Sequence, residues 1–425
     1  MQQTLSSQDR RTLILASLGG ALEFYDFIIF VFFAAVIANI FFPPDIPDWL
    51  RQLQAFGIFA AGYLARPLGG VIMAHFGDLF GRKRMFMISV LLMAVPTLLI
   101  GLLPTYSSIG IAAPVLLLVM RVLQGAAVGG EVPGAWVFVA EHVPPHRTGF
   151  ACGVLTCGLT VGILLGSLMA TGVNTAWTAT EIAEGVWRLP FIVGGIFGLA
   201  ALWLRRYLHE TPVFEQLRAR RALTQGLPIR EVLAGHRDGV IRSMILTWLL
   251  TAGIVVVILM TPTLAQTVYK MGAQDALIAN CLATLTLSIG CVVFGSAADR
   301  FGIDRTLTIG AVSMLISAPL LYWSLSYAPQ YFTLVYMLAG FCVGTVGAVP
   351  TAMVTAFPPA IRFSGVSFSY NLAYALAGGF TPLAVTLWTR SSPHAPAYYV
   401  AVVSLIAVIM MLPGLLRGAA ATSRA

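Results

Sequence analysis

The sequence contains twelve apolar stretches, each long enough to cross a lipid bilayer as a helix. A membrane helix needs about 20 mostly apolar residues. Only 10% of the 425 residues are charged and 58% are hydrophobic, whereas a soluble domain carries about a quarter charged residues. This composition excludes a secreted scaffold, a disordered chain and a cytosolic enzyme. The predicted spans cover about 13–41, 53–75, 86–104, 110–132, 149–173, 187–204, 243–268, 276–298, 306–325, 331–355, 364–388 and 397–416.

The distribution of Lys and Arg predicts the orientation, because positively charged loops stay in the cytoplasm. A cytoplasmic N-terminus assigns 19 of the 25 basic residues to cytoplasmic segments. We therefore predict an all-α membrane protein with twelve transmembrane helices and cytoplasmic N- and C-termini. The net charge of +8 reflects this bias and contact with anionic lipids, so it gives no reason to expect a nucleic acid partner. The polar segment 1–11 lacks a signal-peptide cleavage pattern, so we expect the first span to remain in the mature protein.

The longest polar stretch, 205–242, separates six spans from six and holds eight arginines. A loop signature repeats on its two sides, because Gly77–Arg84 and Ala298–Arg305 share Asp, Phe, Gly and Arg at one offset of 221. Internal repeats of this kind are typical of transporters built from two bundles around a central site. We predict six-helix bundles at 1–204 and 243–425, joined by a cytoplasmic linker at 205–242.

The two repeated loops have the composition of a gate. A carboxylate at a helix end, a glycine and several arginines can form a charge-assisted network that breaks and re-forms as two bundles rock. The alternative is that these charges only set the topology. The predicted gating residues are Arg66, Asp78, Arg82, Arg84, Asp299 and Arg300.

Several motifs resemble those of one transporter family across nearly the whole chain. They include Leu22–Asp26 in the first span, Ala65–Gly70, Gly77–Arg84, and Arg121–Gly125 in the fourth span. With these motifs the chain resembles the major facilitator superfamily and, within it, the metabolite:proton symporter family, whose members carry citrate, 2-oxoglutarate, shikimate, proline or betaine. The resemblance implies transport by alternating access between two bundles. From the family's pattern, Tyr370 and Asn371 are expected to contact the substrate from the second half.

Five ionisable residues are predicted at membrane depth, all in the first half. Such residues are costly in a bilayer unless they are paired or hydrated, so each is a functional candidate. They are Glu23, Asp26, Arg66, Arg121 and Glu131. At about 1.5 Å per residue, Asp26 and Arg121 lie near the midplane, where a transported solute is expected to bind. Glu131 lies nearer the cytoplasmic end, where a gating pair with Arg66 or the Asp78 loop is the other interpretation.

These residue types suit coupled transport of an anion. A buried arginine stays charged and offers bidentate geometry to a carboxylate. If a substrate carboxylate and the Asp26 carboxylate compete for Arg121, protonation of Asp26 frees the arginine for substrate. We therefore predict substrate contacts at Arg121 and Asp26 and proton coupling at Asp26, Glu23 and Glu131. The alternative is a static carboxylate–arginine pair that only holds helices together.

The predicted function is proton-coupled uptake of a small organic anion, a mono- or dicarboxylate, at the cell inner membrane. Span five lacks the Gly-Pro pair of drug antiporters, which favours uptake, and its Leu155 and Leu159 favour a substrate less polar than citrate. The alternative is a zwitterion such as proline or betaine, bound by an aromatic cage. A channel or a receptor is less consistent with the repeated halves. We expect no enzymatic activity, no cofactor, a lipid bilayer as surroundings and a monomer.

A metal centre is not expected. The five cysteines lie inside predicted spans without CxxC spacing or nearby histidine pairs, so they are interpreted as small buried hydrophobic residues.

Overall fold

The computed structural model describes residues 6–80, 82–207 and 228–422, and the side chains at 48, 52, 56, 74–75, 77–80, 82–86, 205, 228–230 and 415–422 lie outside that description. The described residues form helices and connecting turns. The first half of the chain contains α1 (Ser7–Phe32), α2 (Ala34–Phe41), α3 (Asp48–Phe80), α4 (Arg82–Leu102), α5 (Tyr106–Ile109), α6 (Ala112–His142), α7 (Thr148–Ala176), α8 (Ala179–Glu181) and α9 (Arg188–Arg205). The second half contains α11 (Pro228–Gly235), α12 (Arg237–Thr251), α13 (Thr261–Thr267), α14 (Ala273–Phe301), α15 (Ile303–Tyr327), α16 (Phe332–Val343), α17 (Val349–Thr355), α18 (Arg362–Ala373), α19 (Gly379–Thr389) and α20 (Ala395–Thr422).

Ten helical segments in the described chain are long and apolar enough to cross a membrane. The bent pair Ala179–Val186 and Arg188–Leu204 makes an eleventh if it is counted as one span, and Met87–Leu102 is a shorter apolar helix. The all-helical membrane fold is therefore confirmed, whereas the count of twelve stays a prediction.

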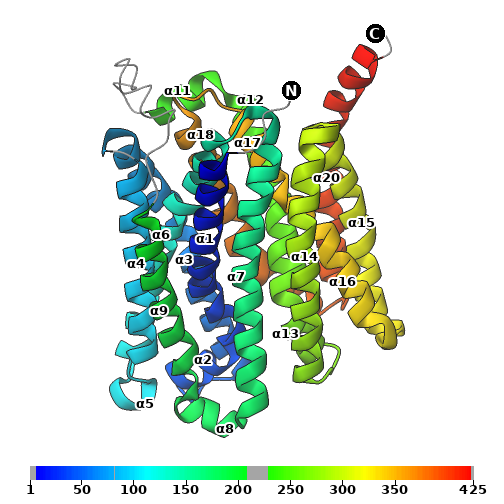
Figure 1. Cartoon of the computed structure of the whole chain (residues 1–425). Helices are drawn as coiled ribbons and strands as arrows, with labels where there is room; N and C mark the ends of the chain where they lie inside the picture. Colours follow the sequence, from blue (N-terminus) through cyan, green and yellow to red (C-terminus); the bar gives the residue numbers. More distant parts are fainter. Residues whose placement is uncertain (1–5, 81, 208–227, 423–425) are drawn as a thin grey trace.

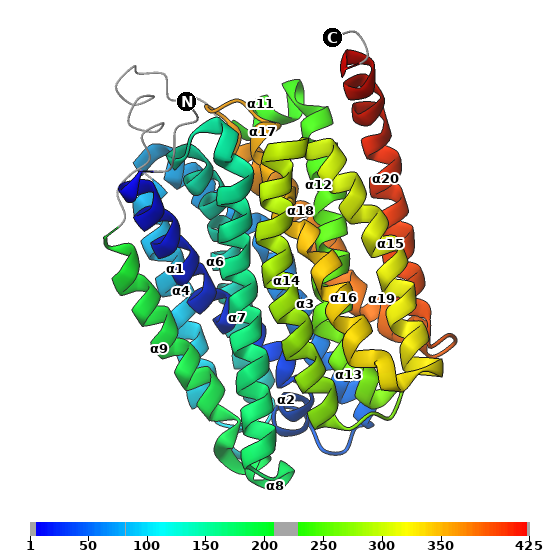
Figure 2. The same ribbon diagram turned by 45° about the vertical axis from the view of Figure 1, so that its right-hand side comes forward.

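Both termini lie at the same end of the helical bundle, together with α11 (Figures 1 and 2). The short helices α5 and α8 lie at the opposite end (Figure 1). This arrangement fits an even number of membrane crossings. Part of the predicted linker, 208–227, lies outside the described residues, and the division into bundles at 205–242 stays a prediction.

The start of α1 follows directly from its sequence. Ser6 accepts a hydrogen bond from the backbone N–H of Asp9 at 3.1 Å, and the Asp9 carboxylate accepts one from the backbone N–H of Ser6 at 2.9 Å. This reciprocal capping box satisfies two N–H groups that a helix start leaves without partners. The polar residues before the first span thus fix where α1 begins.

Glycines let the helices of the first half approach closely. A Cβ atom on Gly125 of α6 would overlap the backbone of Gly62 on α3. Small residues at helix contacts favour close packing in membranes, where van der Waals contact is a main source of association. Because α3 and α6 carry Arg66 and Arg121, this close packing brings the two arginines to neighbouring levels of the bundle.

The two halves meet where α7 packs along α14 and where α3 and α6 pack against helices of the second half. Helix α7 packs along α14, as both views show (Figures 1 and 2), and α3 packs against α18 and α19. Near one end of the first pair, a Cβ on Gly295 would lie 2.5 Å from the carbonyl oxygen of Gly149. Further along, Thr160 and Ser288 are hydrogen-bonded at 2.8 Å, and Ser167 donates to Asn280 at 2.9 Å. The halves are therefore in contact from one end of α7 almost to the other.

Candidate functional site

Arg121 is completely buried on α6 and is held by the first half of the chain. Its Nη1 donates to the carbonyl oxygen of Phe27 at 3.2 Å and to Gln124 Oε1 at 2.9 Å. Its guanidinium carbon lies 4.5 Å from the ring centroids of Phe27 and Phe30 and 5.3 Å from that of Phe59. Rings at these distances stabilise the cation and fix the plane of the guanidinium group.

Two donors of Arg121, Nε and Nη2, have no hydrogen-bond partner within the described part of the chain. These two N–H groups point from the same edge of the guanidinium plane, which is an edge that binds a carboxylate through two parallel hydrogen bonds. A buried donor without a partner is costly. The orientation of Arg121 is therefore well suited to an anionic ligand.

Arg66 repeats this arrangement on α3. It is also fully buried, and its Nε and Nη2 likewise have no hydrogen-bond partner among the described residues. Its guanidinium carbon lies 4.1 Å from the ring centroid of Tyr374, 5.1 Å from that of Tyr370 and 5.5 Å from that of Tyr63. Since Tyr370 and Tyr374 belong to the second half, Arg66 connects the two halves at the level of the predicted site.

Tyr63 joins the surroundings of the two arginines. Its ring centroid lies 4.7 Å from that of Phe59 and 5.3 Å from that of Phe27, the rings that cover Arg121. On its other side it stacks on Tyr374, with 5.2 Å between centroids. One aromatic layer thus runs from Arg121 to Arg66 and across to the second half.

The two residues expected from the second half lie at this junction. The side chain of Asn371 on α18 donates to the carbonyl oxygen of Gly129 on α6 at 2.5 Å. Its Oδ1 has no hydrogen-bond partner in the described residues. Tyr370 packs edge-on against Trp136 of α6, with 4.9 Å between ring centroids. Both residues therefore sit where the halves touch, whereas a role in substrate contact stays a prediction.

Asp26 is buried on α1, but it faces α9 and not Arg121, its expected partner. Both carboxylate oxygens lack hydrogen-bond partners in the part of the chain that is described. A Cβ on Gly194 of α9 would lie 2.8 Å from Oδ1, and one on Gly198 would lie 2.8 Å from Oδ2. Asp26 thus packs on a glycine face of α9, and among the described contacts it makes no ion pair with Arg121.

A chain of hydrogen bonds leads from Arg121 to α4. Arg121 donates to Gln124, whose Nε2 donates to Thr97 Oγ1 on α4 at 2.6 Å. The side chains of Thr97 and Asp26 both border Gly194. The hydroxyl of Thr97 donates to the carbonyl oxygen of Met93 at 2.8 Å, so the chain ends on α4 and Asp26 is not part of it.

The other two predicted carboxylates are also buried. Glu23 lies one turn before Asp26 on α1, with 2% of its surface exposed, and Glu131 lies on α6, with 4% exposed. Both have interaction partners within the structure. Their roles in proton coupling stay predictions.

The end of the bundle that carries the termini is closed by contacts between the halves. The Asp299 carboxylate at the end of α14 accepts hydrogen bonds from the backbone N–H groups of Gly149 and Phe150, each at 2.7 Å. These N–H groups belong to the first turn of α7, where the helix dipole favours a negative charge. Glu141 on α6 forms a second contact across the halves, 3.5 Å from Arg362.

The remaining predicted gating residues are less informative. Arg300 is exposed and lies over the ring of its neighbour Phe301. The side chains of Asp78, Arg82 and Arg84 lie outside the described residues. Arg66, also expected at the gate, lies instead in the aromatic layer at the centre.

Replacement of Asp299 with asparagine should weaken this closure. The amide keeps only one acceptor oxygen and no charge, and hydrogen bonds to a charged group contribute about 1.5–3 kcal/mol. We expect buried Cys152, one turn along α7, to react with a thiol reagent at least roughly tenfold faster than in the wild type.

Asp304→Asn is the matched control, because Asp304 pairs with Arg242 inside the second half. Loss of that pair leaves the contact between the halves intact. Equal labelling rates in Asp299→Asn and the wild type would contradict the assignment of Asp299 to the gate.

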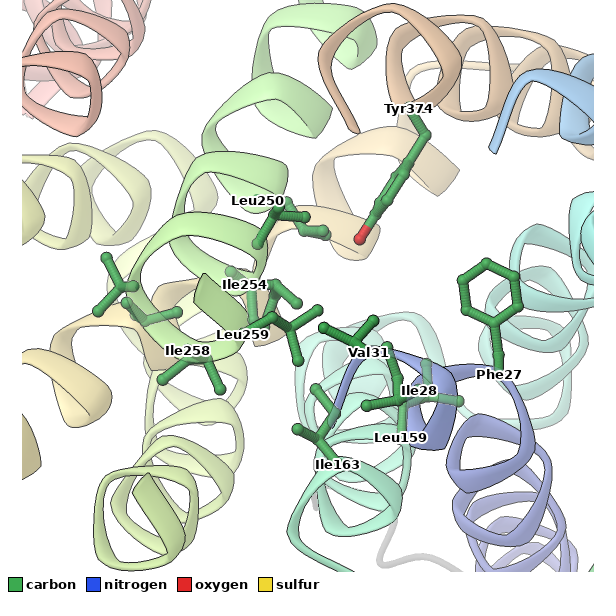
Figure 3. Close-up of a cluster of buried hydrophobic side chains, with 14 of the residues drawn as sticks. Phe27, Ile28, Val31, Leu159, Ile163, Leu250, Ile254, Ile258, Leu259 and Tyr374 are labelled. Carbon is green, nitrogen blue, oxygen red and sulfur yellow. The ribbon is translucent and has the colours of Figure 1, made fainter. Parts of the chain in front are cut away.

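The surface where α1 and α7 face the second half is apolar. Phe27, Ile28 and Val31 of α1 lie with Leu159 and Ile163 of α7. They face side chains of α12 and the π-helical segment that follows it, 252–260, with the Tyr374 hydroxyl pointing towards the cluster (Figure 3). An apolar wall excludes water and strengthens electrostatic interactions at the two arginines.

Within the described chain, no group of three or more His, Cys, Asp or Glu side chains is placed to hold a metal ion.

Three contributors to the site, Tyr63, Gln124 and Trp136, were not predicted from the sequence. Tyr63 and Gln124 each lie three residues from a buried arginine, on the same helix face, and this spacing is the signal that could have identified them.

Comparison with known proteins places the chain among transporters. Residues 16–382 match the sequence model of the Major Facilitator Superfamily. The chain is 34% identical to the shikimate transporter of Escherichia coli over 423 residues, which cover 96% of this chain and 95% of the relative. It is 31% identical to the citrate-proton symporter of Klebsiella pneumoniae over 371 residues, covering 87% and 83%.

A third relative carries zwitterions, as its name states. The glycine betaine/proline/ectoine/pipecolic acid transporter OusA of Dickeya dadantii is 31% identical over 423 residues, covering 96% of this chain and 82% of the relative. Among solved structures, the proton:xylose symporter XylE of Escherichia coli superposes with a TM-score of 0.80 at 18% identity, covering 96% of this chain and 95% of XylE. At that identity the likeness shows the fold alone.

Proposed function

Since the chain belongs to the major facilitator superfamily, we propose that it is a proton-coupled symporter that takes up a small mono- or dicarboxylate by alternating access. One observation carries the choice of an anion. Two buried arginines each present an Nε and Nη2 edge without a hydrogen-bond partner in the described residues. Each edge matches the geometry of a carboxylate.

The second candidate, a zwitterion, is favoured by the zwitterion transporter among the relatives and by the cluster of tyrosines. Quaternary ammonium groups bind over aromatic faces. Here, however, the rings of Tyr63, Tyr370 and Tyr374 surround the guanidinium of Arg66, which already occupies that position. We therefore favour an anion without a cationic group.

In this proposal Arg121 binds a substrate carboxylate and Asp26 carries the coupled proton. An ionised carboxylate without a hydrogen-bond partner is costly to bury, and a bound proton removes that cost. Because Asp26 faces α9, its protonation is coupled to binding at Arg121 through the alternating-access movement of the helices and not through direct competition. Glu23 and Glu131 are further carriers of the proton in this scheme, and Asn371 and Tyr370 contact substrate from the second half.

The proposed architecture has twelve spans in two bundles, 1–204 and 243–425, with the linker 205–242 and both termini in the cytoplasm. Asp299 and Arg300, with Asp78, Arg82 and Arg84 in the first loop, then belong to a cytoplasmic gate, and Arg66 moves between gate and site. The protein is a multi-pass protein of the cell inner membrane. We propose that it acts as a monomer and catalyses no chemical reaction.

Transport by purified protein in liposomes tests this function. With an inward proton gradient and an internal pH dye, each of citrate, 2-oxoglutarate, shikimate, proline and betaine is supplied in turn. We expect one of the carboxylates without an ammonium group to acidify the lumen and to accumulate against its gradient. Acidification with proline or betaine alone would replace the anion proposal by the zwitterion proposal. Solute equilibration without proton movement would contradict symport.

A further inference from the structure

A groove on the outside of the second half is formed by α12, by α18 and α19, and by α20. Its volume is about 520 Å³, and its lining includes Ile241, Ile245, Trp248, Ala377, Phe380 and Tyr399. Ile241 and Phe380 at its rim are 56% and 54% exposed although they belong to membrane helices. The groove therefore faces the hydrocarbon of the bilayer, away from Arg121 and Arg66.

The polar atoms beside the groove are already satisfied by each other. Trp248 Nε1 donates to the hydroxyl of Tyr399 at 2.7 Å, and that hydroxyl is hydrogen-bonded to Thr381 Oγ1 at 2.5 Å. Alanines at 373, 377 and 384 supply the space between the larger side chains. A cavity whose polar groups need no further partner is suited to a hydrocarbon chain.

A positive charge lies one turn of α12 before Ile241, the lining residue nearest the start of that helix. On α12, Arg237 lies on the same face as Ile241, Ile245 and Trp248, because these positions are four, eight and eleven residues further along. Arg237 is exposed, and its Nε donates to the carbonyl oxygen of Leu233 on α11 at 3.1 Å. Leu233 is itself 43% exposed. An apolar groove with an arginine one helical turn beyond its lining is complementary to an amphiphile with an anionic head.

We propose that this groove binds an anionic phospholipid, with an acyl chain along Ile241, Ile245 and Trp248 and the phosphate at Arg237. The occupant is a bilayer lipid because the groove opens to the membrane and its charge lies at one end of the bundle. This site is separate from the proposed transport site, and its occupation does not depend on the identity of the transported solute.

One short segment links the groove to the transport site. In the π-helical turn η6 (Tyr374–Gly378), Leu376 and Ala377 line the groove. The ring centroid of Tyr374, in the same turn, lies 4.1 Å from the guanidinium carbon of Arg66. A lipid chain in contact with Ala377 therefore touches the same helical turn that holds the Tyr374 ring over Arg66.

Quenching of Trp248 fluorescence by brominated acyl chains tests the site. The full chain is reconstituted in phosphatidylcholine vesicles containing a small fraction of brominated phosphatidylglycerol or brominated phosphatidylcholine. Subtraction of the signal of Trp248→Phe isolates the contribution of Trp248. We expect the phosphatidylglycerol to quench it at a roughly fivefold lower mole fraction, which corresponds to the effect of one basic side chain near an anionic lipid surface.

Two variants and one control define the outcome. Arg237→Gln should remove the preference for phosphatidylglycerol, and Ala377→Phe, which fills the groove, should reduce quenching by both lipids. Arg10→Gln removes an exposed arginine from the first half and should leave the preference unchanged. Equal quenching by the two lipids in the wild type, or a preference that survives Arg237→Gln, would overturn the proposal. Because the readout is lipid contact, a failure here leaves the transport proposal intact, and a failure of transport leaves this one intact.

Discussion

Replacement of Arg121 with glutamine should weaken binding of the transported anion at least roughly 30-fold. Glutamine cannot present two parallel N–H groups, and truncating one partner of a buried, hydrogen-bonded charge pair costs about 2–5 kcal/mol. The surrounding rings of Phe27, Phe30 and Phe59 are uncharged, so they cannot replace the positive charge that is lost. Titration of the purified variant with the substrate identified in liposomes, followed by tryptophan fluorescence or calorimetry, measures the change in Kd.

Two further variants separate binding from stability. Arg121→Lys keeps the positive charge but loses the planar fork, so its affinity should fall between that of the glutamine variant and the wild type. Arg390→Gln removes an exposed arginine that lies 5.5 Å from the ring centroid of Trp49 and should bind normally. Retention of wild-type affinity by a folded Arg121→Gln protein would show that this arginine does not hold the substrate.

Replacement of Asp26 with asparagine should abolish proton-driven accumulation while it preserves exchange of substrate across the membrane. Asparagine has the shape of the protonated acid but cannot release a proton. We expect counterflow of labelled substrate at a rate near that of the wild type. Uptake against a gradient should fall to the level of liposomes without protein. The two assays, run on the same preparation, measure exchange and accumulation separately.

The same variant distinguishes a proton carrier from a structural pair. An ionised Asp26 without hydrogen-bond partners in the described residues destabilises the fold, so its neutral replacement should leave the melting temperature unchanged or raise it. A carboxylate that only holds helices together predicts the opposite, because loss of one member of a buried pair is destabilising. Asp275→Asn, at an exposed position in the first turn of α14, is the control for loss of a carboxylate. Simultaneous loss of exchange and stability in Asp26→Asn would contradict the proton-carrier role.

The sequence was most informative about membrane depth. The placement of Glu23, Asp26, Arg66 and Arg121 in the interior of the bundle was predicted from their positions in apolar stretches and is confirmed by their burial. The Asp299 carboxylate, which the loop signature marks, accepts hydrogen bonds from the first half, whereas its role in gating stays a prediction. Depth follows from counting residues along a helix, since the rise per residue is constant.

Contacts between side chains on different helices were less predictable. The sequence favoured direct competition at Arg121, whereas Asp26 lies against Gly194 and Gly198 of α9. Arg66 was expected at the gate and lies among three tyrosines at the centre. In both cases the residue is buried as expected, but its neighbours are not the expected ones.

By itself the sequence determined the all-helical membrane fold, the family and the burial of the ionisable residues, because each of these depends on local composition, spacing or motifs. The tertiary structure alone decided which guanidinium edges stay without partners, which glycine face Asp26 packs on and which groove lies beside the α12 face that carries Arg237. These features depend on how each helix is rotated about its axis. That rotation is set by close packing against neighbouring helices, as at Gly62 and Gly125, and the helix's own residues do not fix it.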